Sequence, residues 1–296
     1  MSHSSRRLFM MSLAATAGLS CGARTTAPKT DRTNPNEAAP IEALELQVGG
    51  RIGLFAVNKA TGRVLNHRAD ERFAMASTFK WVLAAAVLAQ LDSGSISSEE
   101  ELPFNKADLL EHAPFTRPLL VQGFANVRDL AQAIVTVSDN TAANLLLKRI
   151  GGTKAFTSFV KEMGDSTTRL DRLEPFLNTN EPEDDRDTTS PRAMVGLMDR
   201  ILCGTVLSRE SQQCLHGWMR MSETGKRRLR AGLPQGVVVG DKTGTGARGA
   251  VNDIAIVTRA SGHSILIAAY LSGSTSSLDR LEEAHAEIGS IVSRTI

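Results

Sequence analysis

The sequence has few cysteines and histidines, and this scarcity excludes several classes of protein. Its 296 residues include 3 Cys and 6 His, which is too few for a disulfide-stabilised scaffold. No cysteine belongs to a Cys-x-x-Cys pair and no two histidines have zinc-type spacing, so we expect neither a metal nor a cofactor. The chain also lacks internal repeats and, after residue 40, low-complexity tracts.

The chain has no strong excess of charge of either sign. Its 34 Lys and Arg residues face 32 Asp and Glu residues, which gives a net charge of +2. Five of the basic and two of the acidic residues lie within the first 40, so the rest of the chain carries −1. A near-neutral body offers no broad basic surface to nucleic acid or anionic lipid. We therefore expect no nucleic-acid partner.

The first 40 residues are typical of an export signal followed by a polar linker. Arg6 and Arg7 precede a mildly apolar stretch at 11–19, a pattern similar to a twin-arginine (Tat) signal. The stretch is about half as long as a bilayer requires, so we expect no permanent membrane span. Cys21 offers a lipid attachment site, although Gly18-Leu19-Ser20 fits a lipoprotein signal poorly. We predict export by the Tat machinery to the periplasm or the medium.

The other two cysteines lie in apolar segments with helical periodicity. Cys203 directly follows the predicted helix 191–202, and Cys214 lies within the predicted helix 208–220. Because Tat cargo folds before export, we expect these cysteines to stay reduced and to be buried as small apolar side chains.

Extended segments lie at both ends of the body and helical patterns lie between them. The extended segments are 51–57, 63–67, 236–240, 251–259 and 264–272. The helical segments are 77–91, 127–137, 141–150, 153–163, 191–202, 208–220 and 278–294. We predict an α/β fold of the α+β type, with an antiparallel five-stranded sheet flanked by helices and an inserted all-helical domain. The predicted boundaries are 1–40 for signal and linker, 41–74 with 222–296 for the discontinuous α/β domain, and 75–221 for the helical domain.

Lys80 is the one ionisable residue of an otherwise apolar helical segment. No other charge occurs between Arg72 and Asp92, so the helix is buried and its lysine is costly unless it has a use. Ser77 lies one turn earlier, near the helix N-terminus, where backbone N–H groups favour developing negative charge. Alone this is a weak signal, because a helix-capping serine and a snorkelling lysine give the same pattern.

Two tripeptides strengthen this signal. Ser138-Asp139-Asn140 interrupts two helical segments and presents a hydroxyl and an amide from a turn. Lys242-Thr243-Gly244 lies on a strand of the terminal sheet, where Gly244 lets a ligand backbone approach the edge. Each tripeptide is commonplace alone. Ser-x-x-Lys, Ser-Asp-Asn and Lys-Thr-Gly in this order resemble the motifs of class A serine β-lactamases and penicillin-binding proteins.

The segment 172–178 distinguishes between these two relatives. Arg172-Leu173-Glu174-Pro175-Phe176-Leu177-Asn178 matches the Arg-x-Glu-Pro-x-Leu-Asn loop of class A β-lactamases at every specified position. Glu174 and Asn178 can hold one water between a carboxylate and an amide, as hydrolysis of an ester intermediate requires. By the resemblance, Arg172 and Asp187 form the ion pair that closes this loop. Residues 41–296 thus resemble a class A β-lactamase, and this resemblance implies an active site between the sheet and the helical domain.

The resemblance implies five catalytic residues. Ser77 attacks the β-lactam carbonyl and becomes acylated. Either Lys80, or Glu174 through a water, takes the serine proton. Ser138 relays a proton to the leaving nitrogen, while Lys242 supports this network with positive charge. Glu174 then activates the water that releases the product.

The resemblance also implies seven substrate-binding residues. The backbone N–H groups of Ser77 and Thr245 would form the oxyanion hole. The other members bind or orient the substrate or the water, and the whole set is Asn140, Asn178, Thr243, Gly244, Thr245, Arg228 and His112. Thr245 and Gly246 are permissive of cephalosporins, so we expect cephalosporins as well as penicillins as substrates.

Two of these assignments depart from the commonest family pattern. Many relatives carry an Arg for the substrate carboxylate where this chain has Val251. Arg228 aligns with the Arg that replaces it in other members, with its neighbouring arginines as rivals. His112 occupies the position of an aromatic wall, where it would either stack on a substrate ring or be a solvated loop residue.

Three rival functions share part of these motifs. A penicillin-binding DD-peptidase has the first three motifs but deacylates slowly, and Glu174 with Asn178 argues against it. A covalent β-lactam sensor module would need a transmembrane or partner segment, and a secreted esterase on the same scaffold is the weaker third. We expect a monomer that hydrolyses small-molecule β-lactams.

Overall fold

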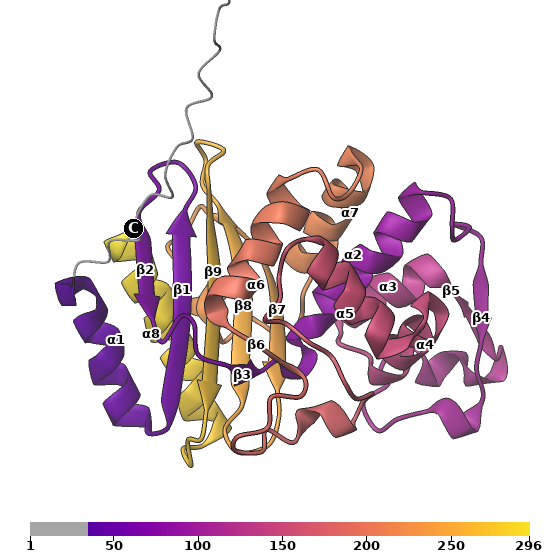
Figure 1. The fold of residues 1–296 in the computed structure, drawn as a ribbon, viewed down its shortest axis with the longest axis horizontal. Helices are drawn as coiled ribbons and strands as arrows, with labels where there is room; N and C mark the ends of the chain where they lie inside the picture. Colours follow the sequence, from indigo (N-terminus) through magenta and orange to yellow (C-terminus); the bar gives the residue numbers. More distant parts are fainter. Residues whose placement is uncertain (1–34) are drawn as a thin grey trace, which may run out of the picture. The chain divides into compact units, whose positions relative to one another are not determined.

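The computed structural model describes residues 35–296 and confirms the predicted antiparallel five-stranded sheet (Figure 1). The strand order is β2-β1-β9-β8-β7, with every neighbouring pair antiparallel. These strands are β1 (Arg51–Asn58), β2 (Val64–His67), β7 (Val238–Thr245), β8 (Val251–Thr258) and β9 (Ser264–Ser272). The pairing of β1 with β9 joins the two ends of the chain in one sheet, as the sequence pattern indicates.

Two short ladders supplement this sheet. One pairs β3 (Phe73–Ala74) with β6 (Thr188–Thr189), and the other pairs β4 (Glu101–Pro103) with β5 (Phe124–Asn126). The first ladder joins the segment just before Ser77 to the end of the loop that carries Glu174. The small β3–β6 sheet therefore connects the two segments from which the predicted nucleophile and carboxylate come.

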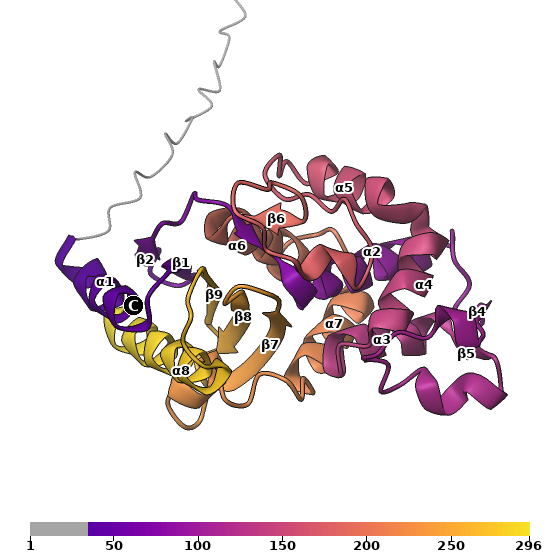
Figure 2. The same cartoon turned by 90° about the horizontal axis from the view of Figure 1, so that it is seen from below.

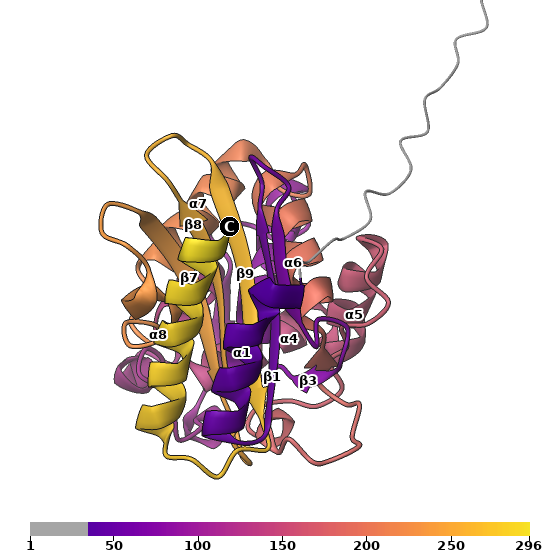
Figure 3. The same ribbon diagram turned by 90° about the vertical axis from the view of Figure 1, so that its left-hand side faces the viewer.

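Two helices, α1 (Pro35–Val48) and α8 (Leu278–Thr295), lie side by side on one face of the sheet (Figures 2 and 3). Ile41 and Leu44 of α1 belong to the same apolar cluster as Ile288 of α8 and the inward residues of the strands. Residues 35–40, predicted as linker, are therefore helical. Two prolines make this segment resemble a linker. Pro35 is the first residue of α1, where proline is tolerated, whereas Pro40 lies inside the helix, which the buried face of α1 stabilises.

The remaining helices pack on the opposite face of the sheet and beyond its β7 edge (Figure 1). The helix α2 contacts four of the others, namely α3, α4, α5 and α7, so it forms the centre of this part. Ten consecutive residues of α2 are buried, as its apolar sequence predicts. The helices are α2 (Phe79–Asp92), α3 (Val127–Thr136), α4 (Asn140–Ile150), α5 (Gly152–Glu162), α6 (Pro191–Met198) and α7 (Arg209–Arg220).

The two cysteines of this part are free thiols, but they are not both buried as predicted. Cys203 is exposed and Cys214 is half-buried. The reason for Cys203 is local: α6 continues into a π-helical turn, Asp199–Cys203, in which Ile201 and Leu202 take the buried positions. The thiol at the end of the turn is left at the surface.

The predicted export signal lies outside the described residues, as does Cys21. Residues 35–296 belong to one compact unit. The predicted division of this unit into an α/β domain and a helical domain, at 74/75 and 221/222, stays a prediction. Within residues 35–296, no helix is both long enough and apolar enough to cross a membrane.

Candidate active site

Ser77 and Lys80 lie together at the start of the buried helix α2. The 3₁₀ turn Ala76–Thr78 leads directly into α2, and Lys80 Nζ donates a hydrogen bond of 2.9 Å to Ser77 Oγ. Lys80 is fully buried, and this burial lowers its pKa, while Glu174 and Asp139 act in the opposite direction. An amine with a lowered pKa beside a hydroxyl is suited to take the proton of a nucleophile.

Glu174 contacts both of these groups. Its Oε1 lies 2.9 Å from Lys80 Nζ and accepts a hydrogen bond of 3.4 Å from Ser77 Oγ. Asn178 Nδ2 donates to the other oxygen, Oε2, at 2.6 Å. Asn178 Oδ1 is buried and has no hydrogen-bond partner among the described residues. A carboxylate and an amide acceptor therefore converge beside the serine, which is the geometry that a positioned water requires.

The hydroxyl of Ser138 lies between two buried lysines. Lys80 Nζ donates to Ser138 O at 2.9 Å and to Ser138 Oγ at 3.3 Å, while Lys242 Nζ donates to the same Oγ at 3.1 Å. Burial lowers the pKa of Lys242 well below its usual range, and the charge of Lys80 lowers it further. The three side chains form a continuous chain of hydrogen bonds from Ser77 to Lys242.

Asp139 holds the turn that presents Ser138. Its fully buried carboxylate caps α4 by accepting from Ala142 N at 2.8 Å, and it also accepts from the backbone N–H groups of Phe115 and Thr116. Ser138 itself has a φ of +60°, in the left-handed region, so these contacts offset local backbone strain. Asn140, on the other side of Asp139, accepts a hydrogen bond from Lys80 Nζ through Oδ1.

Strand β7 runs immediately beside the backbone of Ser77. A Cβ atom on Gly244 would lie 2.7 Å from Met75 O and 3.1 Å from Ser77 N, so only glycine allows this approach. Thr243 is buried and donates to Thr224 Oγ1, while Thr245 is exposed at the end of the strand. The strand thus brings the Thr245 backbone to the neighbourhood of the serine.

Arg228 is the arginine that is hydrogen-bonded to this strand end. Its buried guanidinium donates to Gly244 O at 2.9 Å, to Asn252 O at 2.8 Å and to Thr245 Oγ1 at 2.7 Å. Arg228 Nε also lies 3.3 Å from Glu282 Oε1, so each of these arginines has an acidic partner: Arg230 pairs with the buried Asp241 and Arg248 pairs with Glu181. What favours Arg228 for the predicted carboxylate role is its contact with Gly244 and Thr245 at the end of β7.

His112 lies at the margin of the site. It is exposed, its Nε2 is 3.0 Å from Val137 O, and its carbonyl accepts from Asn140 N at 2.9 Å. The residue is therefore attached to the turn that carries Ser138, but its ring points to a backbone carbonyl.

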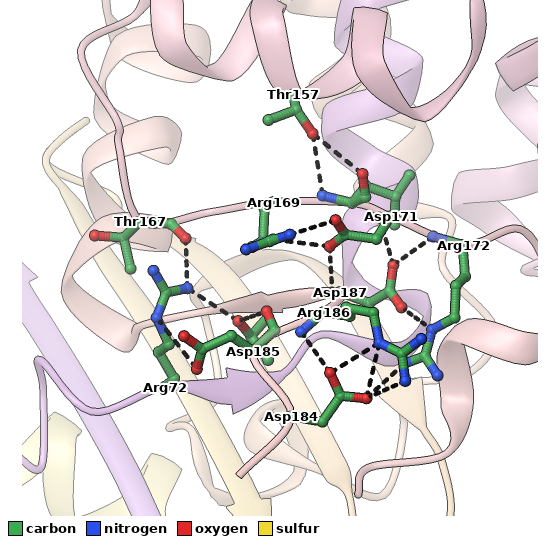
Figure 4. Close-up of polar contacts among 12 residues, drawn as sticks. Arg72, Thr157, Thr167, Arg169, Asp171, Arg172, Asp184, Asp185, Arg186 and Asp187 are labelled. Carbon is green, nitrogen blue, oxygen red and sulfur yellow. Dashed lines mark hydrogen bonds and ion pairs between the residues drawn. The ribbon is translucent and has the colours of Figure 1, made fainter.

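A dense ionic network closes the loop that carries Glu174 (Figure 4). The predicted pair is present: Arg172 Nε lies 2.5 Å from Asp187 Oδ2. The buried Asp187, at the end of the loop, also accepts from Asp171 N at 2.7 Å and from Arg172 N at 2.9 Å, at its start. Arg72 adds a hydrogen bond of 2.7 Å to Thr167 O from the segment before Ser77. The loop is thus fixed at its base.

Two further asparagines position the site, and sequence reasoning missed both. Asn144 binds both backbone groups of Glu174, donating to its O at 2.9 Å and accepting from its N at 3.0 Å. It lies one helical turn after Asn140, a spacing that could have placed it on the same face. The buried Asn252 donates to Ala74 O and to Met75 O, just before Ser77, and no sequence signal distinguishes it within an apolar strand.

The fold and the site together define a serine enzyme that works by acyl transfer. The model of the Beta-lactamase enzyme family matches residues 36–296, so the chain belongs to that family. Its relatives place it in class A, as the sequence motifs predict.

Several known proteins are similar to the chain over most of its length. It is 43% identical over 276 residues to Beta-lactamase L2 of Stenotrophomonas maltophilia, covering 91% of each chain. It is 41% identical over 257 residues to Beta-lactamase AST-1 of Nocardia asteroides, covering 85% of this chain and 83% of that one.

Solved structures agree with these relatives. An ancestral (GNCA) class A β-lactamase superposes with a TM-score of 0.86 at 43% identity, over 88% of this chain and 100% of the other. A putative class A β-lactamase, PenP, from Rhodopseudomonas palustris gives a TM-score of 0.86 at 41% identity with the same coverage. The chain is a class A serine β-lactamase.

Proposed function

We propose that this enzyme hydrolyses penicillins and cephalosporins through an acyl-enzyme on Ser77 that Glu174 deacylates. The observation that carries the proposal is the position of the Glu174 carboxylate, which contacts Ser77, Lys80 and Asn178 at once. One group is then within reach of both the nucleophile and a hydrolytic water.

Acylation uses the buried chain of hydrogen bonds. Ser77 Oγ attacks the β-lactam carbonyl and loses its proton. The proton passes either to Lys80 or, through a water, to Glu174, and both side chains contact the hydroxyl. The C–N bond of the ring breaks, and the nitrogen receives a proton through Ser138. Lys242, which donates to Ser138 Oγ at 3.1 Å, keeps that hydroxyl oriented.

Deacylation uses the carboxylate and amide of the loop. A water bound between Glu174 and Asn178 gives a proton to the carboxylate and attacks the ester carbonyl. The ester C–O bond breaks, and the proton taken up by Glu174 passes to Ser77 Oγ, so the carboxylate and the hydroxyl are both restored after one turnover. The unpartnered, buried Asn178 Oδ1 supports this role, because a buried acceptor is costly unless a water or ligand satisfies it.

Substrate binding follows from the edge of β7 and its neighbours. The backbone N–H groups of Ser77 and Thr245 polarise the reacting carbonyl, and the close approach of Gly244 to Ser77 N supports their pairing. Arg228, through Thr245, supplies positive charge for the substrate carboxylate. Asn140 faces the substrate side-chain amide, and His112 borders the same opening.

A DD-peptidase or a β-lactam sensor is disfavoured by the same carboxylate. In both, the acyl-enzyme formed with a β-lactam would be hydrolysed slowly, whereas Glu174 and Asn178 position the water that hydrolyses it. We further propose that the enzyme is exported, because Arg6 and Arg7 precede a short apolar stretch. Activity in the exported fraction should be lost when both arginines are replaced by lysine, and unchanged export would contradict this.

Substitution of Glu174 tests the proposed division of labour. The variant Glu174→Gln keeps the size of the side chain but cannot accept a proton from water, so it should acylate and then barely deacylate. Intact-protein mass spectrometry after a benzylpenicillin pulse should show a persistent adduct of one penicillin. The variant Ser77→Ala is the control and should show none. An unmodified Glu174→Gln protein would mean that Glu174 is needed for acylation.

A further inference from the structure

The loop that carries Glu174 and Asn178 is attached to the sheet in part through the side chain of Asn180. Asn180 Nδ2 lies 3.2 Å from Ala247 O, 3.1 Å from Arg248 O and 3.1 Å from Ser272 Oγ, and it donates to these acceptors. The Ser272 hydroxyl in turn donates to Asn180 Oδ1 at 3.2 Å. One amide thus joins the loop to the β7–β8 turn and to the end of β9.

The orientation of this amide is fixed by its partners. Two of them, Ala247 O and Arg248 O, are carbonyl oxygens that accept but cannot donate, so the NH₂ group must face them. Asn180 has a φ of +48°, in the left-handed region that asparagine tolerates better than most residues. The side chain and the backbone therefore both suit asparagine at this position.

The attachment lies two residues from the proposed water-binding amide. Ala247 N donates to Asn178 O at 2.8 Å, and a Cβ on Gly246 would lie 2.8 Å from the same oxygen. The β7–β8 turn thus contacts the loop at Asn178 through backbone and at Asn180 through a side chain. A displacement of this turn would move Asn178, which holds Glu174 Oε2.

After Asn180, the loop segment 181–185 is linked to the β7–β8 turn by the exposed ion pair of Glu181 with Arg248. The segment 181–185 faces the end of β9 across a cavity of about 600 Å³, whose lining includes Arg51, Arg72 and Arg248. The ion pair of Arg248 with Glu181, at 2.6 Å, crosses here, but both side chains are about half exposed. Exposed pairs of this kind contribute little, whereas Ser272 on the far side of the Asn180 contact is buried.

We propose that Asn180 is a positioning residue for deacylation. It holds Asn178 and Glu174 at the correct distance from the acyl ester by tying their loop to the β7–β8 turn. It does not touch Ser77, Lys80 or the oxyanion hole, and Lys80 can serve as the base in acylation, so the loss of Asn180 should slow deacylation far more than acylation. The inference rests on the proposed deacylating role of Glu174.

The isosteric variant Asn180→Asp removes the NH₂ donors and places a carboxylate oxygen against the two carbonyls. Its left-handed backbone remains accessible. With a penicillin, the deacylation rate constant should fall about tenfold while the acylation rate constant stays within about twofold. Because slow deacylation lowers kcat and KM together, kcat/KM should stay nearly constant. Asn180→Gly, which keeps the backbone freedom and loses the amide, should behave in the same way.

The matched control is Asn126→Asp, far along the chain. Asn126 also donates through Nδ2 to a backbone carbonyl, Ser98 O at 2.8 Å, and caps α3, a role that Asp fulfils equally. Its acylation and deacylation rates should equal those of the wild type. Glu181→Gln, which breaks the exposed ion pair, should change deacylation by less than about twofold.

Three outcomes would count against the inference or against the proposed function, and they can be told apart. A deacylation rate of Asn180→Asp within about twofold of the wild type would overturn the inference. An equal fall of acylation and deacylation would also overturn it, since the residue would then support the whole site. If the wild type forms an acyl-enzyme that never turns over, the proposed function itself fails, which is visible before any variant is compared.

Discussion

Acidification should destabilise the folded protein through one buried histidine. His285 lies in α8, fully buried, where its Nε2 donates to Val251 O at 2.9 Å and its Nδ1 has no partner among the described residues. Burial, and after it the positive charge of Arg228, lowers the pKa of His285 from 6.5 to about 3. The ring therefore stays neutral in the folded state under mildly acidic conditions.

The size of this effect follows from the difference between the two states. In the unfolded chain the pKa of His285 returns to about 6.5. Between that value and about 3 the unfolded state binds a proton that the folded state does not, so the free energy of unfolding falls as the pH falls. From pH 7 to pH 5, this proton removes about 2 kcal/mol of stability.

Urea unfolding at these two pH values measures the effect directly. His285→Gln keeps a donor for Val251 O but does not titrate, so its loss of stability should be smaller than that of the wild type by about 2 kcal/mol. His263→Gln, at an exposed histidine between β8 and β9, is the control and should lose as much as the wild type. Equal losses in the wild type and His285→Gln would refute the reasoning.

Two further substitutions test the site and its loop. Arg228→Ala should lower kcat/KM for penicillins by about 10- to 100-fold through a higher KM, because a charge-assisted contact is lost. For a penicillin ester, which lacks the free carboxylate, kcat/KM should fall far less. Arg248→Ala is the control and should keep the wild-type kcat/KM. Unchanged kinetics of Arg228→Ala would mean that another residue binds the carboxylate. Asp187→Asn should lower the free energy of unfolding in urea by about 2 kcal/mol, since it breaks a largely buried pair. Glu183→Gln, at an exposed side chain, is the control and should leave the stability unchanged. Equal stabilities of Asp187→Asn and Glu183→Gln would contradict the stabilising role of the Asp187 ion pair.

Most of the fold could be predicted because its pattern is local. The five strands have alternating or continuous apolar runs bounded by turn residues, and the α2 segment is apolar on all sides around Lys80. The helix α1 was missed because Pro35 and Pro40 are typical of a linker, and only the packing of Ile41 and Leu44 on the sheet stabilises it as a helix. The exposure of Cys203 depends on a π-helical turn that hydrophobic periodicity does not reveal.

The candidate site was predictable where its residues occur in motifs, and not where they act through the backbone. Ser77, Lys80 and Glu174 are marked by their neighbours in the sequence. Asn144 and Asn180 bind backbone atoms of segments distant in the chain, at separations of 30 and 67 or more residues. A contact of that kind depends on the tertiary arrangement, so a single sequence contains no local pattern for it.

The central claim is that Ser77 is acylated and Glu174 releases the product, so that the enzyme turns over. The most direct measurement is a time course of the purified protein, with helix α1 intact, and excess chromogenic cephalosporin. We expect the amount of hydrolysed cephalosporin, read from the absorbance, to exceed the amount of enzyme many times over. A burst that stops near one equivalent would contradict it, because Ser77 would then acylate without release by Glu174.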